Sequence, residues 1–193
     1  YLSQFFKDGD HIGVSMGMTL HNVAKTKRAF PKDNHYMFVP IIGGISPTTV
    51  NNVDVQSNQI AREYAEKFGG TYTQFLAPAL FSEKRVKDYF LKEKTVNFIF
   101  DDFQKLDVLV MGIGATSTCT DSTMIQGGYI TSEETKALVE NGVAGNVALQ
   151  FFDENGDTGK FRAFNERVAG MSPDMIKRVR SRIGIGGGEE RAK

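Results

Sequence analysis

A chain of 193 residues, 40% hydrophobic and 24% charged, has the composition of one globular domain with a core of its own. Basic and acidic residues number 23 each, so net charge gives no indication of a nucleic-acid or membrane partner. No apolar run approaches the ~20 residues of a membrane span, no signal peptide is recognisable at the start, and one cysteine excludes an internal disulfide. These features predict a cytoplasmic protein in a reducing compartment.

Strand and helix patterns alternate along the chain. We expect strands at residues 11–15, 36–42, 71–76, 107–114, 146–152 and 182–187. We expect helices at residues 19–30, 54–68, 82–92, 95–105, 132–140 and 172–179. Ser132 and Ser172 mark good helix starts, because acidic residues follow the first and a proline follows the second. The alternation requires crossover connections, which predicts an α/β fold with a mostly parallel sheet and helices on both faces.

Residues 151–164, FFDENGDTGKFRAF, differ from this alternation. Asn155-Gly156 lies between apolar flanks, and Asn-Gly is a preferred pair for a tight hairpin turn. We therefore predict a small antiparallel β-hairpin here, as an appendage or at an edge of the sheet.

Glycines cluster where four of the predicted strands end. They are Gly17, Gly43 and Gly44, Gly112 and Gly114, and Gly186, Gly187 and Gly188. Parallel α/β proteins bind ligands outside the carboxyl ends of their strands, and glycine lets the backbone approach a ligand closely. No cluster matches GxGxxG or GxxxxGK[ST], so the loops do not indicate a dinucleotide or a P-loop nucleotide. Any one loop is also explained as a tight turn.

Polar side chains accompany these loops. Thr19 stands at a predicted helix start, where it either caps the helix or donates to a phosphate. Gln56 and Asn58 lie near the start of the helix after the second glycine loop, where amides either reach a sugar hydroxyl or remain surface groups. The terminal GGGEERAK places Glu189 and Arg191 beside a glycine turn, a pattern that a charged helix start also explains.

Side-chain patterns typical of catalysis are missing. The histidines lie in the first fifth of the chain, and none pairs with Cys, Asp or Glu at metal-ligand spacing, so we expect no metal and no cofactor. The sequence has no GxSxG elbow, and Cys119 has no activating neighbour. Asp101 and Asp102 point about 100° apart on the predicted helix, which favours a solvated face over paired carboxylates.

The ordered set of motifs resembles the effector-binding domain of the SorC-type, sugar-responsive bacterial transcription regulators. The motifs are DGDHIGVSMGMTLHNVA, VPIIGG, VQSNQIAREYAEKFGG, LAPA, DVLVMGIG, NGVAGNVALQFFDENG and RVAGMSPDMIKRVRSRIGIGGGEE. The resemblance covers nearly the whole chain. It implies a Rossmann-like fold related to sugar-phosphate isomerases and deaminases, a phosphorylated sugar as effector, and a homodimer or homotetramer. It also implies that residues 1–193 are a fragment and that DNA is bound through a helix-turn-helix domain outside it.

The resemblance also implies roles for individual residues. It assigns the phosphate loop to Gly17, Met18 and Thr19, a second wall to Gly43 and Gly44, and the floor to Gly112 and Gly114. Gln56 and Asn58 match polar residues that face the ligand in relatives. We count Gly187, Gly188 and Glu189 of the last glycine loop among the ligand-binding residues as well.

Three positions depart from the family pattern. Asn146 and Arg191 stand where relatives usually carry an acidic residue and a lysine, respectively. Asn146 keeps hydrogen-bonding capacity without the charge, and Arg191 keeps the charge but cannot serve as a Schiff-base amine. Ile42 stands where a relative carries a phosphate-binding arginine. One cation fewer favours a monophosphorylated sugar over a bisphosphate.

Two other functions compete with ligand sensing. An isomerase or deaminase of the same fold needs a general base, and the deaminases carry an acidic residue and a histidine after the central glycine loop. Residues 112–124, GIGATSTCTDSTM, contain Asp121 but no histidine, which favours a sensor that is not an enzyme. In an interaction domain without ligand, the glycine loops would be turns only.

Overall fold

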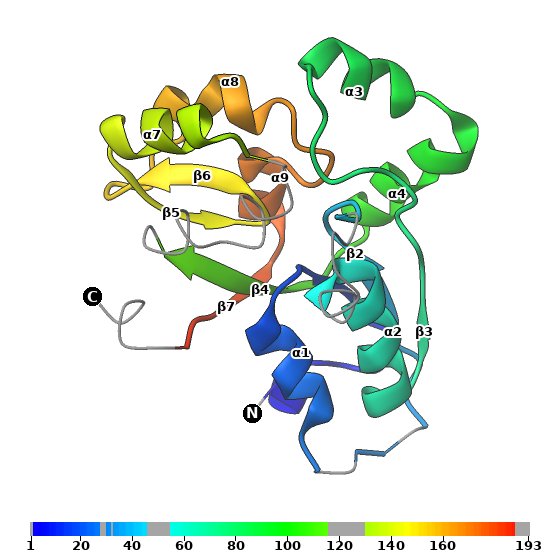
Figure 1. The fold of residues 1–193 in the computed structure, drawn as a ribbon. Coiled ribbons are helices and arrows are strands. Elements are labelled where there is room, and N and C mark those ends of the chain that lie inside the picture. Colours follow the sequence, from blue (N-terminus) through cyan, green and yellow to red (C-terminus); the bar gives the residue numbers. More distant parts are fainter. Residues whose placement is uncertain (1, 28–29, 32, 46–54, 116–129, 188–193) are drawn as a thin grey trace.

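The computed structural model describes residues 2–27, 30–31, 33–45, 55–115 and 130–187 (Figure 1). Its parallel strands are β1 (His11–Val14), β2 (Met37–Pro40), β3 (Thr71–Tyr72), β4 (Val108–Ala115) and β7 (Ser181–Ile185). They run in the order β3-β2-β1-β4, and β7 pairs with β4. β4 also pairs antiparallel with β5 (Val143–Val147), which pairs with β6 (Gln150–Asp153). The predicted α/β class and mostly parallel sheet are confirmed.

Helices cover both faces of the parallel sheet, as the alternation predicts. The longer helices are α1 (Met18–Lys25), α2 (Ser57–Phe68), α4 (Lys94–Gln104) and α7 (Ser132–Glu140). The shorter ones are α3 (Lys84–Phe90), α8 (Arg162–Asn165), α9 (Pro173–Arg178) and the 3₁₀ turns η1 (Leu2–Gln4) and η3 (Gly159–Phe161). In β4, Val108 and Val110 face the core under α1 and α2, whereas Leu109 and Met111 face the core under α4. This period of two is the mark of a strand buried on both sides.

Both predicted helix starts are confirmed, but the predicted serine is the capping residue at only one of them. The Ser172 hydroxyl accepts a hydrogen bond from the Met175 N–H, with a proline in the first turn. At α7 the cap is Thr131 rather than Ser132, because Thr131 and Glu134 form a reciprocal capping box. α1 ends at Lys25 and not near residue 30, since Thr26 adopts an extended backbone.

The hairpin prediction at Asn155-Gly156 is wrong. The hairpin lies earlier, where Ala148 (φ 49°) and Leu149 (φ 61°) form the turn between β5 and β6 and divide the strand predicted at 146–152. After β6 the Asp153 carboxylate accepts hydrogen bonds from the N–H groups of Asn155 and residue 157, and η3 and α8 follow. Both turn side chains are buried, so tertiary packing outweighs the local preference for Asn-Gly.

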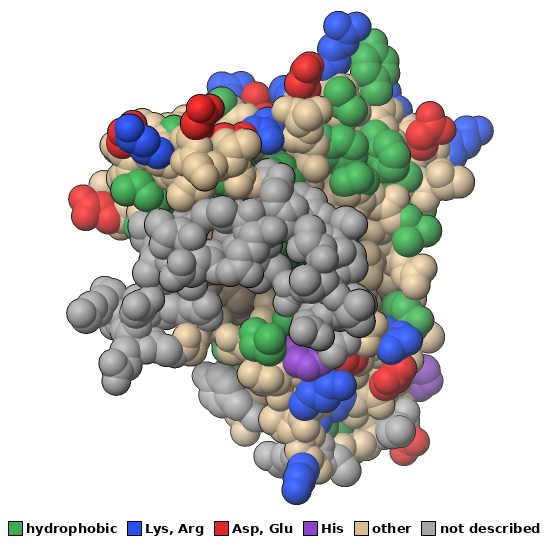
Figure 2. All heavy atoms as spheres, in the orientation of Figure 1, with side chains coloured by type: hydrophobic (Ala, Val, Ile, Leu, Met, Phe, Trp, Pro, Cys, Tyr) green, Lys and Arg blue, Asp and Glu red, His purple; other side chains and the backbone are tan. Residues whose placement is uncertain are grey.

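The surface is mixed in charge. Figure 2 shows basic and acidic side chains interspersed over the visible face rather than gathered by sign. Within the described ranges, no helix has the length and apolarity needed to cross a bilayer.

Candidate functional site

The carboxyl ends of four parallel strands bring the glycine loops to one edge of the sheet. Strand β1 pairs in parallel with β2 and β4, and β4 pairs in parallel with β7, so the carboxyl ends of all four strands point the same way. Gly17 follows β1, Gly43 lies just beyond β2, and Gly187 follows β7. Gly112 and Gly114 lie within the last residues of β4 rather than after it. The predicted clusters therefore share an edge, as the crevice rule for α/β sheets requires.

The loop after β1 leads directly into α1. Gly17 is the N-cap residue with φ 136° and ψ 152°, a conformation that a side chain would strain. Its N–H donates to the Val55 carbonyl at 2.8 Å. Met18 and Thr19 are the first two helical residues, and the N–H groups of a first turn have no partner within their helix. This arrangement offers backbone donors and the positive end of a helix dipole to an anion.

Thr19 does not cap α1, so the capping alternative is wrong. No side chain caps this helix, and the half-buried Thr19 hydroxyl forms no hydrogen bond with another described residue. A Cβ on Gly187 would lie 3.9 Å from Thr19 Oγ1, so the loop after β7 stands beside the loop after β1. The predicted ligand residues Gly188, Glu189 and Arg191 lie outside the described residues, as do Cys119 and Asp121.

The second glycine loop faces the start of α2. A Cβ on Gly43 would lie 2.4 Å from the Ala77 carbonyl oxygen, so any side chain there collides with backbone. A Cβ on Gly44 would lie 3.1 Å from Gln56 Oε1 and 3.9 Å from Asn58 Nδ2. The structure therefore brings Gln56 and Asn58 to the glycine loop with which they were predicted to act.

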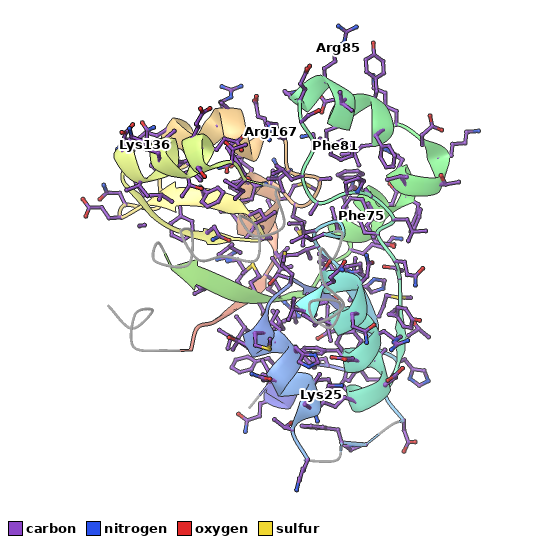
Figure 3. The ribbon with its side chains drawn as sticks, viewed as in Figure 1. Lys25, Phe75, Phe81, Arg85, Lys136 and Arg167 are labelled. Atoms are coloured by element: carbon purple, nitrogen blue, oxygen red, sulfur yellow. The ribbon has the colours of Figure 1, made fainter. Side chains whose placement is uncertain are left out.

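Gln56 and Asn58 differ in how much of their amide is already used. Asn58 Nδ2 donates to the Phe75 carbonyl at 3.1 Å, and Asn58 Oδ1 accepts from the Phe75 N–H at 2.8 Å. Asn58 thus holds the segment around Phe75, which is labelled in Figure 3, against α2. The Gln56 amide forms no hydrogen bond within the described residues, so Gln56 has more capacity for a ligand.

The floor is held by a serine that sequence reasoning missed. Ser15 is fully buried, its Oγ accepts from the Gly112 N–H at 2.9 Å, and its hydroxyl lies 3.2 Å from the Met16 carbonyl to which it donates. The bond joins the end of β1 to β4. Only its position at the end of a predicted strand gave a sequence signal, since its partner is 97 residues away.

Asn146 lies over the other floor glycine. It is opposite Gly114 in the β4–β5 register, and a Cβ on Gly114 would lie 2.5 Å from Asn146 Nδ2. The absence of a side chain at Gly114 therefore makes room for the Asn146 amide at the end of β4.

The described part of the site is uncharged. Its predicted residues are glycines, amides, a threonine and a methionine, so binding there depends on hydrogen bonds and the helix dipole. The described residues contain no group of three His, Cys, Asp or Glu side chains suited to a metal ion. Nearby, burial raises the pKa of Tyr64, whose hydroxyl donates to the Leu20 carbonyl at 3.2 Å and keeps α1 against α2.

A mostly apolar cavity of about 510 Å³ lies between α1, α2 and β7 and reaches Gly186 of the last glycine loop. Its walls include Val23 of α1, Phe68 of α2, and Ile183 and Ile185 of β7. The predicted ligand residues do not line it, and its walls offer little to a sugar phosphate.

A parallel sheet with glycine loops and helix N-termini at its carboxyl edge defines a Rossmann-like ligand-binding domain. Comparison with known families is more specific: residues 1–193 match the family described as "Putative sugar-binding domain", and the chain belongs to that family. The resemblance to SorC-type effector domains is thereby confirmed.

Relatives and solved structures agree with this family. The chain is 26% identical over 192 residues to the deoxyribonucleoside regulator of Bacillus subtilis, covering 99% of this chain and 58% of the relative. It is 25% identical over 188 residues to the central glycolytic genes regulator of the same organism, covering 97% and 51%. The full-length sorbitol operon regulator of Klebsiella pneumoniae matches with a TM-score of 0.84 at 24% identity, covering 99% of this chain and 60% of that one.

These relatives are named as regulators and not as enzymes, which agrees with the prediction that this chain senses a ligand. The chain spans little more than half the length of the two curated relatives.

Proposed function

We propose that this chain is the effector-sensing part of a bacterial transcriptional regulator and that it binds a phosphorylated sugar without transforming it. The observation that carries the proposal is the loop from Gly17 to Thr19. A glycine with positive φ precedes α1. The Thr19 hydroxyl lies beside the loop that holds Gly187, and it forms no hydrogen bond with another described residue. The family membership supplies the sugar, and this loop supplies a place for its phosphate.

The phosphate is bound by the start of α1. Backbone N–H groups of the first helical turn and the Thr19 hydroxyl donate to its oxygens, and the helix dipole favours its charge. Arg191 supplies the balancing cation, in line with the resemblance. With Ile42 in place of a second cation, the ligand is a monophosphate.

The sugar lies across the rest of the edge. Gln56 provides an amide that no described residue uses, and Asn146 provides a second amide over Gly114. Neutral amides suit hydroxyl groups because they both donate and accept. Asn146 and the other described site residues include no carboxylate or histidine that would act as a general base, which favours sensing over an isomerase or deaminase.

Control of transcription follows from differential affinity. Effector binding shifts the equilibrium between two arrangements only as far as it binds one better than the other. We propose that the arrangement is read out by a homodimer or homotetramer in the cytoplasm and by a DNA-binding domain outside residues 1–193. The names of the relatives, which are regulators, support this part of the proposal.

A thermal-shift screen tests the proposed function. The chain is heated with hexose and pentose monophosphates, their unphosphorylated parents and inorganic phosphate. A ligand that binds only the folded state raises the free energy of unfolding by about 2.7 kcal/mol when its concentration is a hundred times its Kd. We expect one sugar phosphate to raise the Tm while its parent does not. If every phosphorylated compound leaves the Tm unchanged, Gly17 to Thr19 is a turn and the proposal fails.

A further inference from the structure

A buried carboxylate on α2 connects this helix to α1. Glu63 is 8% exposed, and its Oε2 lies 3.1 Å from His21 Nδ1. Its Oε1 lies 3.4 Å from Lys25 Nζ and accepts a hydrogen bond from Gln59 Nε2 at 3.2 Å. His21 and Lys25 both belong to α1, one turn apart. One carboxylate therefore contacts two consecutive turns of the neighbouring helix.

Both apolar and polar contacts attach α1 to α2, since Val23 and Ala24 pack against the core beside Leu20. Leu20 is the one fully buried residue of this helix, so its apolar face is short and the polar contacts help to set its rotation. Besides the Glu63 contacts, Lys67 Nζ of α2 donates to the Thr26 carbonyl at 2.6 Å. A carboxylate is costly to bury without partners, so Glu63 favours the orientation of α1 in which His21 and Lys25 reach it. Figure 3 shows Lys25 at the end of α1 beside α2.

The N-terminal ends of the same two helices form two walls of the candidate site, the phosphate loop at α1 and Gln56 at α2. α1 begins at the phosphate loop, and α2 begins after Gln56. The starts are tied by the hydrogen bond from the Gly17 N–H to the Val55 carbonyl. Because each helix is rigid over a few turns, the rotation of α1 against α2 sets how the phosphate donors face the Gln56 amide.

We propose that Glu63 is a positioning residue for effector binding, holding α1 against α2 so that the phosphate loop and Gln56 engage one ligand together. This inference rests on the proposed function. Glu63 touches no ligand itself and acts through His21 and Lys25. A sugar phosphate spans both walls, whereas inorganic phosphate needs only the start of α1.

The difference between these two ligands is the test. Glu63→Gln keeps the size of the side chain and removes its charge. We expect it to weaken binding of the sugar phosphate by about tenfold, within the range of coupled contacts. Binding of inorganic phosphate changes by less than about twofold, because it uses one wall. A role in stability alone lowers the Tm and leaves both dissociation constants of the folded protein unchanged.

The matched control is Glu66→Gln on the same helix. Glu66 is exposed and pairs with Arg62 on α2, so its removal leaves α1 untouched and both affinities stay at their wild-type values. If Glu63→Gln does not fold, His21→Ala removes the same contact from α1 and is measured instead. The inference is overturned if the variant weakens the binding of sugar phosphate and of inorganic phosphate equally, or if it weakens neither.

Hydrogen exchange tests the positioning without any ligand. We expect the hydrogen-bonded amides of residues 21–25 to exchange faster in Glu63→Gln and at the wild-type rate in Glu66→Gln. Unchanged exchange in Glu63→Gln overturns the inference even if no sugar phosphate binds the wild type. If no sugar phosphate binds the wild-type protein, it is the proposed function that fails, and this result is measured on the wild-type protein alone.

Discussion

Replacing the threonine of the phosphate loop separates binding from folding. Thr19→Val is nearly isosteric and removes one hydroxyl from the second residue of α1. Among the described residues this hydroxyl has no partner, and it does not cap the helix. Both residues are β-branched, so their backbone preferences in the helix are similar. We therefore expect the free energy of unfolding to change by no more than about 0.5 kcal/mol.

The effect on binding is much larger. In the proposed site the Thr19 hydroxyl donates to a phosphate oxygen, and hydrogen bonds to charged groups contribute about 1.5–3 kcal/mol. Losing that bond raises the Kd for the sugar phosphate by roughly 10- to 150-fold. Isothermal titration calorimetry gives the Kd, and urea unfolding gives the stability of the same preparation.

A threonine at the other end of the same helix is the control. The Thr26 hydroxyl donates to the Val23 carbonyl at 2.9 Å and is exposed. Thr26→Val should leave the Kd at its wild-type value. If Thr19→Val folds and binds the sugar phosphate as tightly as Thr26→Val does, the start of α1 is not the phosphate site.

Three further outcomes follow from contacts of the described residues. Ser15→Ala removes the fully buried acceptor of the Gly112 N–H and should lower the free energy of unfolding by about 1–3 kcal/mol in urea, whereas Ser82→Ala at an exposed position should change it very little. Gly114→Ala places a Cβ 2.5 Å from Asn146 Nδ2, so we expect the amide to move and calorimetry to show weaker sugar-phosphate binding with little loss of stability; unchanged binding would remove Asn146 from the site. Burial raises the pKa of Glu134, but a backbone N–H and the Arg167 guanidinium outweigh it, so the pKa lies below the usual 4.5. The stability that this carboxylate contributes is thus present above pH 4.5 and lost as the pH falls through its folded-state pKa. In Glu134→Gln the urea unfolding midpoint should therefore depend less on pH across that range.

Local pattern was sufficient for most of the elements. The continuous apolar run at residues 107–114 predicts β4, and the helical spacing after Thr131 predicts α7 with the observed bounds. Both signals come from side chains a few residues apart that share one environment. The same reasoning failed at Asn155-Gly156, because the buried Ala148 and Leu149 place the hairpin turn earlier than the local preference does.

By itself, the sequence determined the α/β class, the alternation of elements and the position of the glycines at strand ends, since periodicity and glycine preference are local properties of the chain. Only the tertiary structure decided which groups meet at the site. The Ser15 contact spans 97 residues, and the Glu63 contact to His21 spans 42. Asn58 uses its amide on Phe75, whereas the nearby Gln56 does not. Such pairs depend on how helices pack across the sheet, and no spacing within one segment encodes them.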